Sequence, residues 1–403
     1  MHTNFGELLK HVWVAIIAGG QGTRLFPLSY EDCPKQFCRL NDKHTFIQDT
    51  IIRFTAVGAK ASRIVIVTTN DRQTELAKQQ TAKLGVITPN IYQINPEFGY
   101  AGAMIKAAAF IKKQDSKAII INTPADQYVK IGNNFISTMQ SAIECANNGI
   151  PSIIGVKEYD LTTFMGCGHA TFHPNESSHC KTVKGFIEKP DKETAIAMMR
   201  QENSACNTGI NVWRAVDLID ITKGRKIKGI GTDTLMAHFK GNLKLAVGEF
   251  EWHDCGTLKS LYAVSPKTPN HKNASIGEVT RYKCLNSLFV TIDGVRLHAS
   301  GIHNEAIVIN QIGGNYVVVS AKLDDSQKVR RLAEDYQANK DFLTDDFSVG
   351  AHGNNVMFSN LSHELRCGFI GVNHHFVHGV QQFDGTVDIY VSDQYYGEKS
   401  AKN

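Results

Sequence analysis

The chain has 403 residues, of which 42% are hydrophobic and 20% are charged, and its formal net charge is +4. These values are typical of a globular protein large enough for two domains, and the mild charge argues against nucleic-acid binding. No apolar run reaches the roughly 20 residues that a membrane helix needs, and residues 1–10 lack the apolar core of a signal peptide. We therefore expect a cytoplasmic protein that binds neither nucleic acid nor membranes, with its nine cysteines reduced.

Short apolar runs alternate with amphipathic segments through the first two thirds of the chain. Strands are predicted over 12–18, 63–69, 118–123, 152–156, 183–187, 206–213 and 243–250. Helices are predicted over 44–56, 72–84, 101–113, 135–147 and 192–201. Strands separated by helices of this length indicate βαβ units, and therefore an α/β fold with a Rossmann-like, mostly parallel sheet flanked by helices. In such sheets ligands bind beyond the carboxyl ends of the strands.

The polar, proline-bearing segment 265–273 predicts a domain boundary. Beyond it, strands are predicted over 287–292, 295–300, 306–311 and 315–321, with Gly313-Gly314 as a hairpin turn and a helix over 326–339. Further strands are predicted over 355–359, 367–372 and 386–391. We therefore expect a first domain over 1–265, a small β-rich domain with one helix over 266–345, and a β-rich tail of unknown role over 346–403.

A glycine-rich loop follows the first predicted strand directly. Glycines allow tight turns and let backbone N–H groups approach an anion closely. We predict that the loop binds a nucleotide through Ala18, Gly19, Gly20, Gly22 and Thr23. Arg24 and Lys35 follow and would neutralise phosphate charge. The spacing matches neither the dinucleotide-binding fingerprint nor the Walker A loop, and a turn that uses glycines only for geometry is the alternative.

Acidic and polar residues follow several of the later strands. Asp126 and Asp254 each come after an apolar strand and lie in a tight turn, which suits magnesium ligands as well as turn or helix caps. Glu188 and Lys189 precede a proline at the end of another strand, where they could bind a sugar phosphate or form a surface ion pair. The amide of Asn207 can both donate to and accept from sugar hydroxyls.

Six motifs occur in the order and at the approximate spacing of the sugar-1-phosphate nucleotidyltransferases. They are Gly-Gly-Gln-Gly-Thr-Arg-Leu-Phe-Pro-Leu-Ser at 19–29, Pro-Lys-Gln-Phe at 34–37, Pro-Ala-Asp at 124–126, Phe-Ile-Glu-Lys-Pro at 186–190, Asn-Thr-Gly-Ile at 207–210 and Trp-His-Asp-Cys-Gly at 252–256. Over about residues 12–340 the chain resembles this family, most closely its mannose-1-phosphate guanylyltransferase branch.

The resemblance implies transfer of GMP from GTP to mannose 1-phosphate, with release of pyrophosphate and with Mg²⁺ as the cofactor. Arg24 and Lys35 would be catalytic, and Asp126 and Asp254 would hold the metal. The sugar phosphate would be bound by Gly168, Glu188, Lys189 and Asn207. The partners are then GTP and a sugar 1-phosphate, and a homodimer is compatible with this interpretation.

The chain departs from the family pattern at three places. Gln127 stands where the family has histidine, segment 98–103 replaces Arg-Asn-Thr-Ala-Pro near the base and ribose, and Gly-Cys-Gly-His at 166–169 replaces Gly-Tyr-Gly-Tyr beside the sugar. Another base, hexose or heptose therefore stays open, as does a regulatory subunit that binds a nucleotide sugar without making it. Two histidine-bearing tracts leave metal binding open. The spacing in 167–180 fits no standard zinc pattern, and the histidines at 374–378 favour a partly exposed polar strand face over a metal site.

Overall fold

The computed structural model describes residues 5–20, 22–39, 43–157, 160–174, 176, 179–312, 315–339, 367–369, 376–381 and 386–392. The chain forms two compact units, one of Met1–Gly19 with Phe46–Asp254 and the other of Gly20–Thr45 with Cys255–Asn403. The polypeptide therefore passes between the units inside two of the motifs. The hairpin turn expected at 313–314, the strand expected over 355–359, and His374 and His375 lie outside the described residues.

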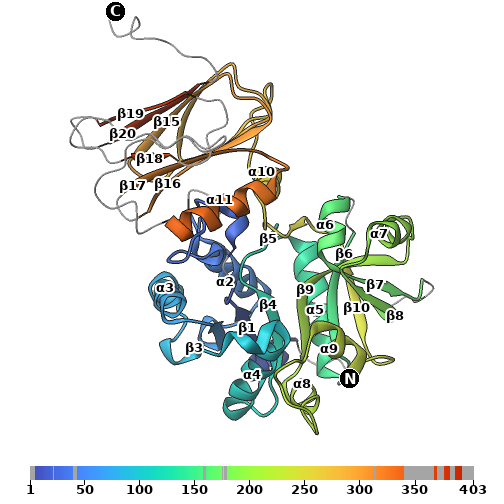
Figure 1. The fold of residues 1–403 in the computed structure, drawn as a ribbon. Coiled ribbons are helices and arrows are strands. Elements are labelled where there is room, and N and C mark those ends of the chain that lie inside the picture. The colour runs from blue at the N-terminus through green and yellow to red at the C-terminus, as the bar shows by residue number, and fades with distance from the viewer. Residues whose placement is uncertain are drawn as a thin grey trace, which may run out of the picture. The chain divides into compact units, whose positions relative to one another are not determined.

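The first unit contains a mixed sheet with the order β3-β2-β1-β4-β9-β6-β10-β8-β7 among the described residues (Figure 1). Its strands are β1 (Val12–Ile17), β2 (Ile64–Thr68), β3 (Ile91–Gln93), β4 (Ile119–Pro124), β6 (Ser152–Val156), β7 (Gly168–Phe172), β8 (Cys180–Glu188), β9 (Ser204–Arg214) and β10 (Lys244–Gly248). Pairing is parallel from β3 to β4 and between β6 and β10, while β9 runs antiparallel to β4 and β6. The expected α/β fold class is confirmed.

Helices flank this sheet and a short ribbon extends it. The helices are α1 (Phe5–Leu8), α2 (Phe46–Val57), α3 (Asp71–Thr81), α4 (Gly99–Gln114), α5 (Asn133–Asn147), α6 (Leu161–Gly166), α7 (Lys192–Met199), α8 (Ala215–Asp220) and α9 (Thr232–His238). The ribbon consists of β5 (Tyr128–Val129) and β11 (Trp252–His253). Side-chain caps define several helix starts; for example, Asn70 accepts a hydrogen bond from the backbone N–H of Gln73 at the start of α3.

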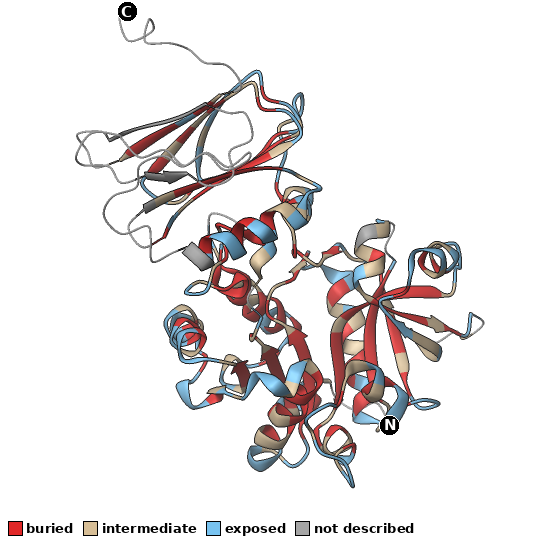
Figure 2. Cartoon of the chain, viewed as in Figure 1, coloured by how far each residue is buried: buried red, intermediate tan, exposed pale blue. Residues whose placement is uncertain are grey.

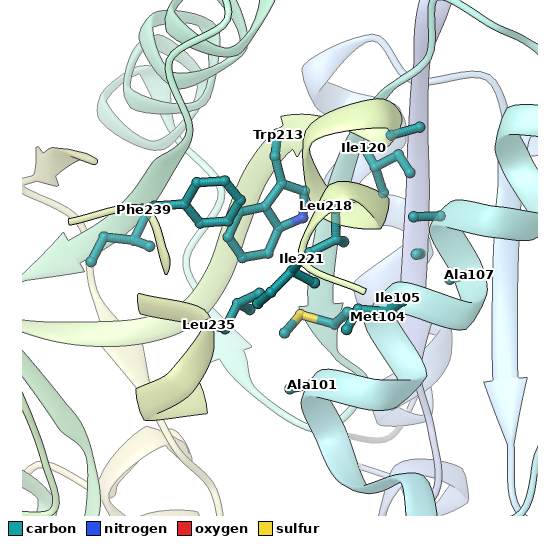
Figure 3. Packing of buried hydrophobic residues seen from close by; sticks show 14 of the residues in the cluster. Ala101, Met104, Ile105, Ala107, Ile120, Trp213, Leu218, Ile221, Leu235 and Phe239 are labelled. Atoms are coloured by element: carbon teal, nitrogen blue, oxygen red, sulfur yellow. The ribbon is translucent and has the colours of Figure 1, made fainter. Parts of the chain in front are cut away.

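The main core of the first unit lies between the sheet and helices α4, α8 and α9 (Figure 3). Trp213 of β9 stacks on Phe239 with ring centroids 5.7 Å apart, and its Nε1 donates to Asn122 Oδ1 at 2.5 Å. Figure 2 shows the central strands buried along most of their length. Both faces of these strands are apolar, which is why their sequences are continuous hydrophobic runs rather than alternating ones.

The second unit is rich in β structure, as expected from the sequence. It contains η2 (Thr23–Leu25), η3 (Lys35–Phe37), α10 (Leu258–Val264), β12 (Ala274–Ile276), β13 (Glu278–Tyr282), β14 (Leu288–Val290), β15 (Val295–Ser300), β16 (Glu305–Ile312), β17 (Asn315–Lys322), α11 (Ser326–Asn339), β18 (Cys367–Phe369), β19 (Phe376–Gln381) and β20 (Val387–Ser392). Two sheets form, with the orders β12-β14-β16-β17-β18 and β13-β15-β20-β19.

From β12 to β16, successive strands of the second unit alternate between its two sheets. β12, β13 and β14 each pair in parallel with the strand two places further along the chain, so this part of the chain winds as a short coil. Leu297, Ile307 and Ile389 belong to the buried cluster of this coil. Within the described parts of both units, no helix is long and apolar enough to span a membrane.

Candidate active site

The chain leaves β1 at the carboxyl edge of the sheet, where the predicted loop begins at Ala18. The backbone N–H of Ala125 donates to Ile17 O at 3.2 Å, which holds the segment after β4 beside this point. The carbonyl of Gly19 accepts from Thr69 Oγ1 at 3.2 Å, and a Cβ on Gly19 would lie 2.6 Å from Thr69 Cγ2. Glycine is therefore needed at position 19 for close packing against the end of β2.

A cavity of about 620 Å³ opens at the carboxyl ends of β2 and β3. It is lined by Thr69, Gln93, Ile94, Asn95, Pro96 and Glu97. Thr69 is the residue that contacts Gly19, so the cavity adjoins the first part of the glycine loop. Glu97 pairs with Lys228 Nζ at 2.7 Å. The lining therefore offers amides and a carboxylate, which can hydrogen-bond the edge of a heterocyclic base.

The two predicted metal ligands border the same short ribbon although they are far apart in sequence. In the ribbon of β5 and β11, His253 pairs with Tyr128 in antiparallel register. Asp254 directly follows β11 and Asp126 lies two residues before β5, so both border the same end of this antiparallel pair. Among the described residues, no group of three or more His, Cys, Asp or Glu side chains could hold a metal. Two carboxylates would leave further coordination positions to phosphate and water, as magnesium requires.

Three of the predicted sugar-phosphate residues lie in one row across neighbouring strands. Gly168 of β7 pairs with Glu188 of β8. On its other side, His169 pairs with Cys206 of β9, so Gly168 lies beside Asn207. The row Glu188–Gly168–Asn207 is therefore set by the hydrogen-bonding register of three strands. The sequence motifs alone could not show this adjacency, because they are separated along the chain.

The backbone is tightly packed at this row. A Cβ on Gly168 would lie 2.6 Å from both Glu188 Oε2 and Phe186 Cζ. Lys189 has φ +48°, an uncommon conformation for a residue with a side chain. Its backbone N–H donates to Cys167 O at 3.1 Å, which holds this conformation. Such strained positions are concentrated at functional sites.

The surroundings of Glu188 shift the pKa of its carboxyl upward. Burial raises the pKa of this carboxyl, and the charge of Asp233 acts in the same direction, while Lys189 partly opposes both. A carboxyl with a raised pKa gains from a ligand that donates hydrogen bonds to it or brings positive charge close. Sugar hydroxyls are such donors.

The Asn-Thr-Gly turn of β9 is fixed by two side chains from elsewhere in the first unit. Asn207 Oδ1 accepts from the backbone N–H of Gly209 at 3.1 Å. Gln127 Nε2 donates to Thr208 O at 2.5 Å. Tyr100 Oη donates to Gly209 O at 3.0 Å. The turn that carries Asn207 is thus held at two consecutive carbonyls.

The rest of the glycine loop belongs to the second unit, where it folds onto the Pro-Lys-Gln-Phe motif. Gly22 has φ +72°, and a Cβ there would overlap Cβ of Lys35. Gln36 Nε2 donates to Gly20 O at 3.0 Å, and Ser29 Oγ donates to Gly22 O. These contacts explain why the two motifs occur together: each supplies the other's hydrogen-bond or packing partner.

The two predicted catalytic cations differ in exposure. Arg24 lies in η2 and its side chain is exposed, as is suitable for a group that must reach a soluble phosphate. Lys35 begins η3 and is only 3% exposed. A lysine stem this buried has few rotamers available, so its ammonium is held in a defined place.

Helix α11 supports this loop inside the second unit. The rings of Phe26 and Tyr336 lie 5.3 Å apart, and Asn310 Nδ2 donates to Pro27 O at 2.7 Å. The apolar face of α11 consists of Val329, Leu332, Ala333 and Tyr336, spaced as one stripe of a helix. The loop that carries Arg24 therefore depends on residues about 300 positions later, as the 283-residue separation of Asn310 and Pro27 shows.

The sequence model of the nucleotidyl transferase family matches residues 14–271, which is more than half of the chain. The chain belongs to this family. It is 24% identical over 363 residues to a mannose-1-phosphate guanylyltransferase of Sinorhizobium fredii, covering 81% of this chain and 69% of the relative. A xanthan biosynthesis protein of Xanthomonas campestris is 26% identical, covering 74% of this chain and 68% of that protein. The recognition from the motifs is confirmed.

A solved structure shows the same fold as this nucleotidyl transferase. The crystal structure of a mannose-1-phosphate geranyltransferase from Thermus thermophilus superposes with a TM-score of 0.67 at 20% identity. The match covers 81% of this chain and 99% of that one. The similarity extends beyond the matched family region and so includes part of the β-rich second unit.

The histidine tract 167–180 of this nucleotidyl transferase shows no metal centre among its described residues. His169 is fully buried, stacks on Phe164 with ring centroids 3.5 Å apart, and contacts Phe164 O through Nε2 at 2.5 Å. Burial lowers the pKa of this imidazole. His169 is therefore a core residue of β7 that packs against α6.

Sequence reasoning missed the contribution of Tyr100 and Gln127 to the site. No motif includes Tyr100, and its bond to Gly209 spans 109 residues. A signal was nevertheless present, because both residues lie where the chain departs from the family pattern. Both departures contact one three-residue turn.

Proposed function

We propose that this nucleotidyl transferase transfers GMP from GTP to mannose 1-phosphate, giving GDP-mannose and pyrophosphate. An oxygen of the sugar phosphate attacks the α-phosphorus of GTP, and the bond from that phosphorus to the β-phosphate oxygen breaks. The observation that best supports the proposal is the row Glu188–Gly168–Asn207, which follows from the register of three strands of the first unit. The position of Ala125 beside the end of β1 supports it further. The names of the curated relatives support the choice of substrates.

The reaction joins two anions, so charge neutralisation is its main requirement. We assign Arg24 and Lys35 to the triphosphate, where they stabilise charge that develops on the pyrophosphate leaving group. The backbone of Ala18, Gly19, Gly20, Gly22 and Thr23 would bind the nucleotide phosphates. Lys189 would pair with the phosphate of the sugar, while Glu188 and Asn207 hydrogen-bond its hydroxyls.

Asp126 and Asp254 fit a magnesium site. Both residues border the same end of the ribbon of β5 and β11, and hard oxygen ligands in this number are what magnesium takes in proteins that bind phosphates. When bound, the ion would screen the negative charge of the phosphate oxygens. The protein would supply both carboxylates from the segments that border β5 and β11.

The cavity beside Gly19 is suited to the guanine base. Glu97 lines it, and a carboxylate can accept hydrogen bonds from both N–H donors on the edge of guanine. Uracil and thymine offer one N–H donor on the corresponding edge. Gln93 and Asn95 add amides that can pair with the base carbonyl.

A matrix of GTP, ATP, UTP, CTP and dTTP against mannose, glucose and heptose 1-phosphates, scored by pyrophosphate release, tests the proposal. We expect release to be largest for GTP with mannose 1-phosphate. A clear preference for UTP or dTTP would overturn guanine specificity, and a preference for another sugar would overturn the acceptor. Tight GDP-mannose binding without any release would instead favour a regulatory subunit.

We also propose that the enzyme works in the cytoplasm, where nucleoside triphosphates are available, and that it can form a homodimer. Light scattering on the purified chain at several concentrations tests the second point. A single mass equal to one chain at all concentrations would exclude the dimer.

A further inference from the structure

We propose that Tyr100 and Gln127 are positioning residues that fix the Asn207–Gly209 turn and thereby set the preference for the sugar 1-phosphate. This inference rests on the proposed function, because it takes Asn207 as a sugar contact. It concerns two side chains outside the motifs that carry Asn207 and Glu188. Both act through the turn rather than by touching the substrate.

The hydrogen bonds converge on two neighbouring carbonyls. Gln127 Nε2 donates to Thr208 O at 2.5 Å, and Tyr100 Oη donates to Gly209 O at 3.0 Å. Gly209 has φ +77°, so the peptide units on either side of it are turned out of the regular strand geometry. Gly209 O also accepts from Asn211 Nδ2 at 3.0 Å, so removing Tyr100 Oη would leave it one donor instead of two. Removing Gln127 Nε2 would take away the donor to Thr208 O, and with either loss the turn would gain alternative conformations.

The turn controls the side chain of Asn207. Its Oδ1 accepts from the N–H of Gly209 at 3.1 Å, which leaves the Nδ2 group as the donor for a ligand hydroxyl. Asn207 is 8% exposed and lies beside Gly168, whose other neighbour is Glu188. A rotation of the Gly209 peptide would therefore turn the Asn207 amide relative to the rest of the row.

Both donors are themselves held in place. Burial raises the pKa of Tyr100, and the charge of Asp126 acts in the same direction, so its hydroxyl keeps the proton that it donates. Arg53, which is 1% exposed, donates through Nη2 to Gln127 O at 2.6 Å and fixes the backbone there. Gln127 is 5% exposed, and its Oε1 is buried with no hydrogen-bond partner among the described residues.

The amide of Gln127 uses its Nε2 to hold the turn, while its Oε1 has no hydrogen-bond partner among the described residues. A buried acceptor without a partner costs free energy, which is tolerated here while the amide donates to the turn. A residue kept under such a cost is expected to serve function rather than stability. Gln127 and segment 98–103 are also places where the chain departs from the family pattern. The resemblance puts segment 98–103 near the base and ribose, but Tyr100 Oη contacts the turn that carries Asn207, so we expect acceptor preference to follow Tyr100 and Gln127.

The experiment compares Tyr100→Phe, Gln127→Leu and the double variant with the unmodified chain. Steady-state kinetics with mannose and glucose 1-phosphate give KM for each substrate, and calorimetry gives the affinity for mannose 1-phosphate without turnover. For each single variant we expect the KM and Kd for mannose 1-phosphate to rise about fivefold and the KM for GTP to change less than about twofold. In the double variant, the KM and Kd for mannose 1-phosphate should rise by less than the product of the two single-variant increases, because both hydrogen bonds hold the same turn.

Matched controls separate this effect from loss of any similar bond. Tyr262→Phe removes a tyrosine hydroxyl that donates to Lys272 O at 2.6 Å in the second unit. Gln48→Leu removes an amide that donates to Gln80 O at 2.9 Å. Neither should alter the KM for the sugar. Gln127→His retains a ring N–H donor and should keep most of the affinity, which also covers the case that Gln127→Leu does not fold.

The outcomes distinguish this inference from the proposed function. If the unmodified chain releases no pyrophosphate, the proposed function fails. The calorimetric affinities for mannose 1-phosphate would still test whether Tyr100 and Gln127 position the turn. Unchanged affinity for mannose 1-phosphate in both single variants would overturn the inference. Equal weakening of GTP and sugar binding, with a lower melting temperature, would show that the two residues only stabilise the fold. That result would overturn the inference as well.

Discussion

The two units place their candidate functional residues in different ways. In the first unit, Glu188, Gly168 and Asn207 lie at strand positions whose neighbours are set by backbone register. In the second unit, Arg24 lies on a loop of short 3₁₀ turns that is held by side-chain contacts with α11 and β16. The positions of the sugar-phosphate residues follow from the pairing of strands in a sheet. The position of Arg24 depends on a few side-chain contacts between distant segments.

This difference predicts how each set responds to change. A sheet register is maintained by many hydrogen bonds, so a single side-chain substitution should not move the row. The loop depends on a small number of contacts, and losing one should change the geometry of the cations while the sugar row stays intact. Substitutions in the two units should therefore separate nucleotide effects from sugar effects.

The largest expected effect comes from removing a charged group in either unit. Asp126→Asn, Asp254→Asn and Lys35→Met should each lower kcat about a thousandfold, because charge neutralisation supplies most of the rate. The aspartate variants should also need more magnesium, whereas Lys35→Met, which keeps the buried stem, should not. Pyrophosphate release against magnesium concentration measures both. Near-normal magnesium-dependent activity in both aspartate variants would refute the metal assignment.

A control for these variants is Asp293→Asn in the second unit. Asp293 pairs with Arg39 at 2.9 Å, but its side chain is 82% exposed. An exposed ion pair contributes little to stability. Its loss should leave kcat unchanged within about twofold. A large loss of activity in this variant would show that the assay responds to charge changes in general.

A second prediction concerns the helix that supports the loop. Tyr336→Ala removes the ring that packs on Phe26 and should lower the stability of the second unit by about 3 kcal/mol. We expect kcat to fall about tenfold, since the loop that carries Arg24 loses its support, with the affinity for mannose 1-phosphate unchanged. Denaturant unfolding and calorimetry measure these quantities.

Gln337→Ala on the same helix is the matched control. Its Nε2 donates to Glu31 Oε2 at 2.6 Å in an exposed position, so its removal should have little effect. If Tyr336→Ala weakened sugar binding as much as it lowered kcat, the proposed independence of the two sets would be wrong.

The strand-based part of the site could be predicted from sequence because its signals are local. Asp126 follows a continuous apolar run, and Asn207 and Glu188 each lie within a short motif on one strand. Their adjacency was not predictable, because the order of β8, β7 and β9 in the sheet depends on tertiary pairing. The support of Phe26 by Tyr336 was also hidden, since helical periodicity shows which face is apolar but not what it covers.

A third prediction tests the packing of the row. Gly168→Ala would bring a Cβ within 2.6 Å of Glu188 Oε2 and Phe186 Cζ, so both side chains must shift. We expect the KM for the sugar 1-phosphate to rise about fivefold with the KM for GTP unchanged. Gly166→Ala, where a Cβ meets nothing within 4 Å, is the control. Equal effects of the two substitutions would mean that helix or strand propensity, not the row, is responsible.

The smallest expected effect is a pH dependence that distinguishes two glutamates of the first unit. Burial and then Asp233 raise the pKa of Glu188, against the opposing charge of Lys189, whereas hydrogen bonds from Thr182 and the ammonium of Lys244 lower that of Glu176 to about 2. A raised pKa means that the folded state holds the proton longer, so stability falls as pH rises from the unfolded value of 4.5 through the folded one. A lowered pKa contributes stability above the unfolded value, and that stability is lost as pH falls toward 2.

The two Glu→Gln variants should therefore respond to pH in opposite directions. Relative to the unmodified chain, Glu188→Gln should become more stable as pH rises from 4 to 7, and Glu176→Gln should become less stable, each by a melting-point shift of about 2 °C or less. Thermal unfolding at several pH values, with low salt to limit screening, measures both. The same sign for both variants would mean that Glu188 is stabilised in its charged form like Glu176. Glu188 would then have no raised pKa for the hydrogen bonds of a sugar hydroxyl to lower.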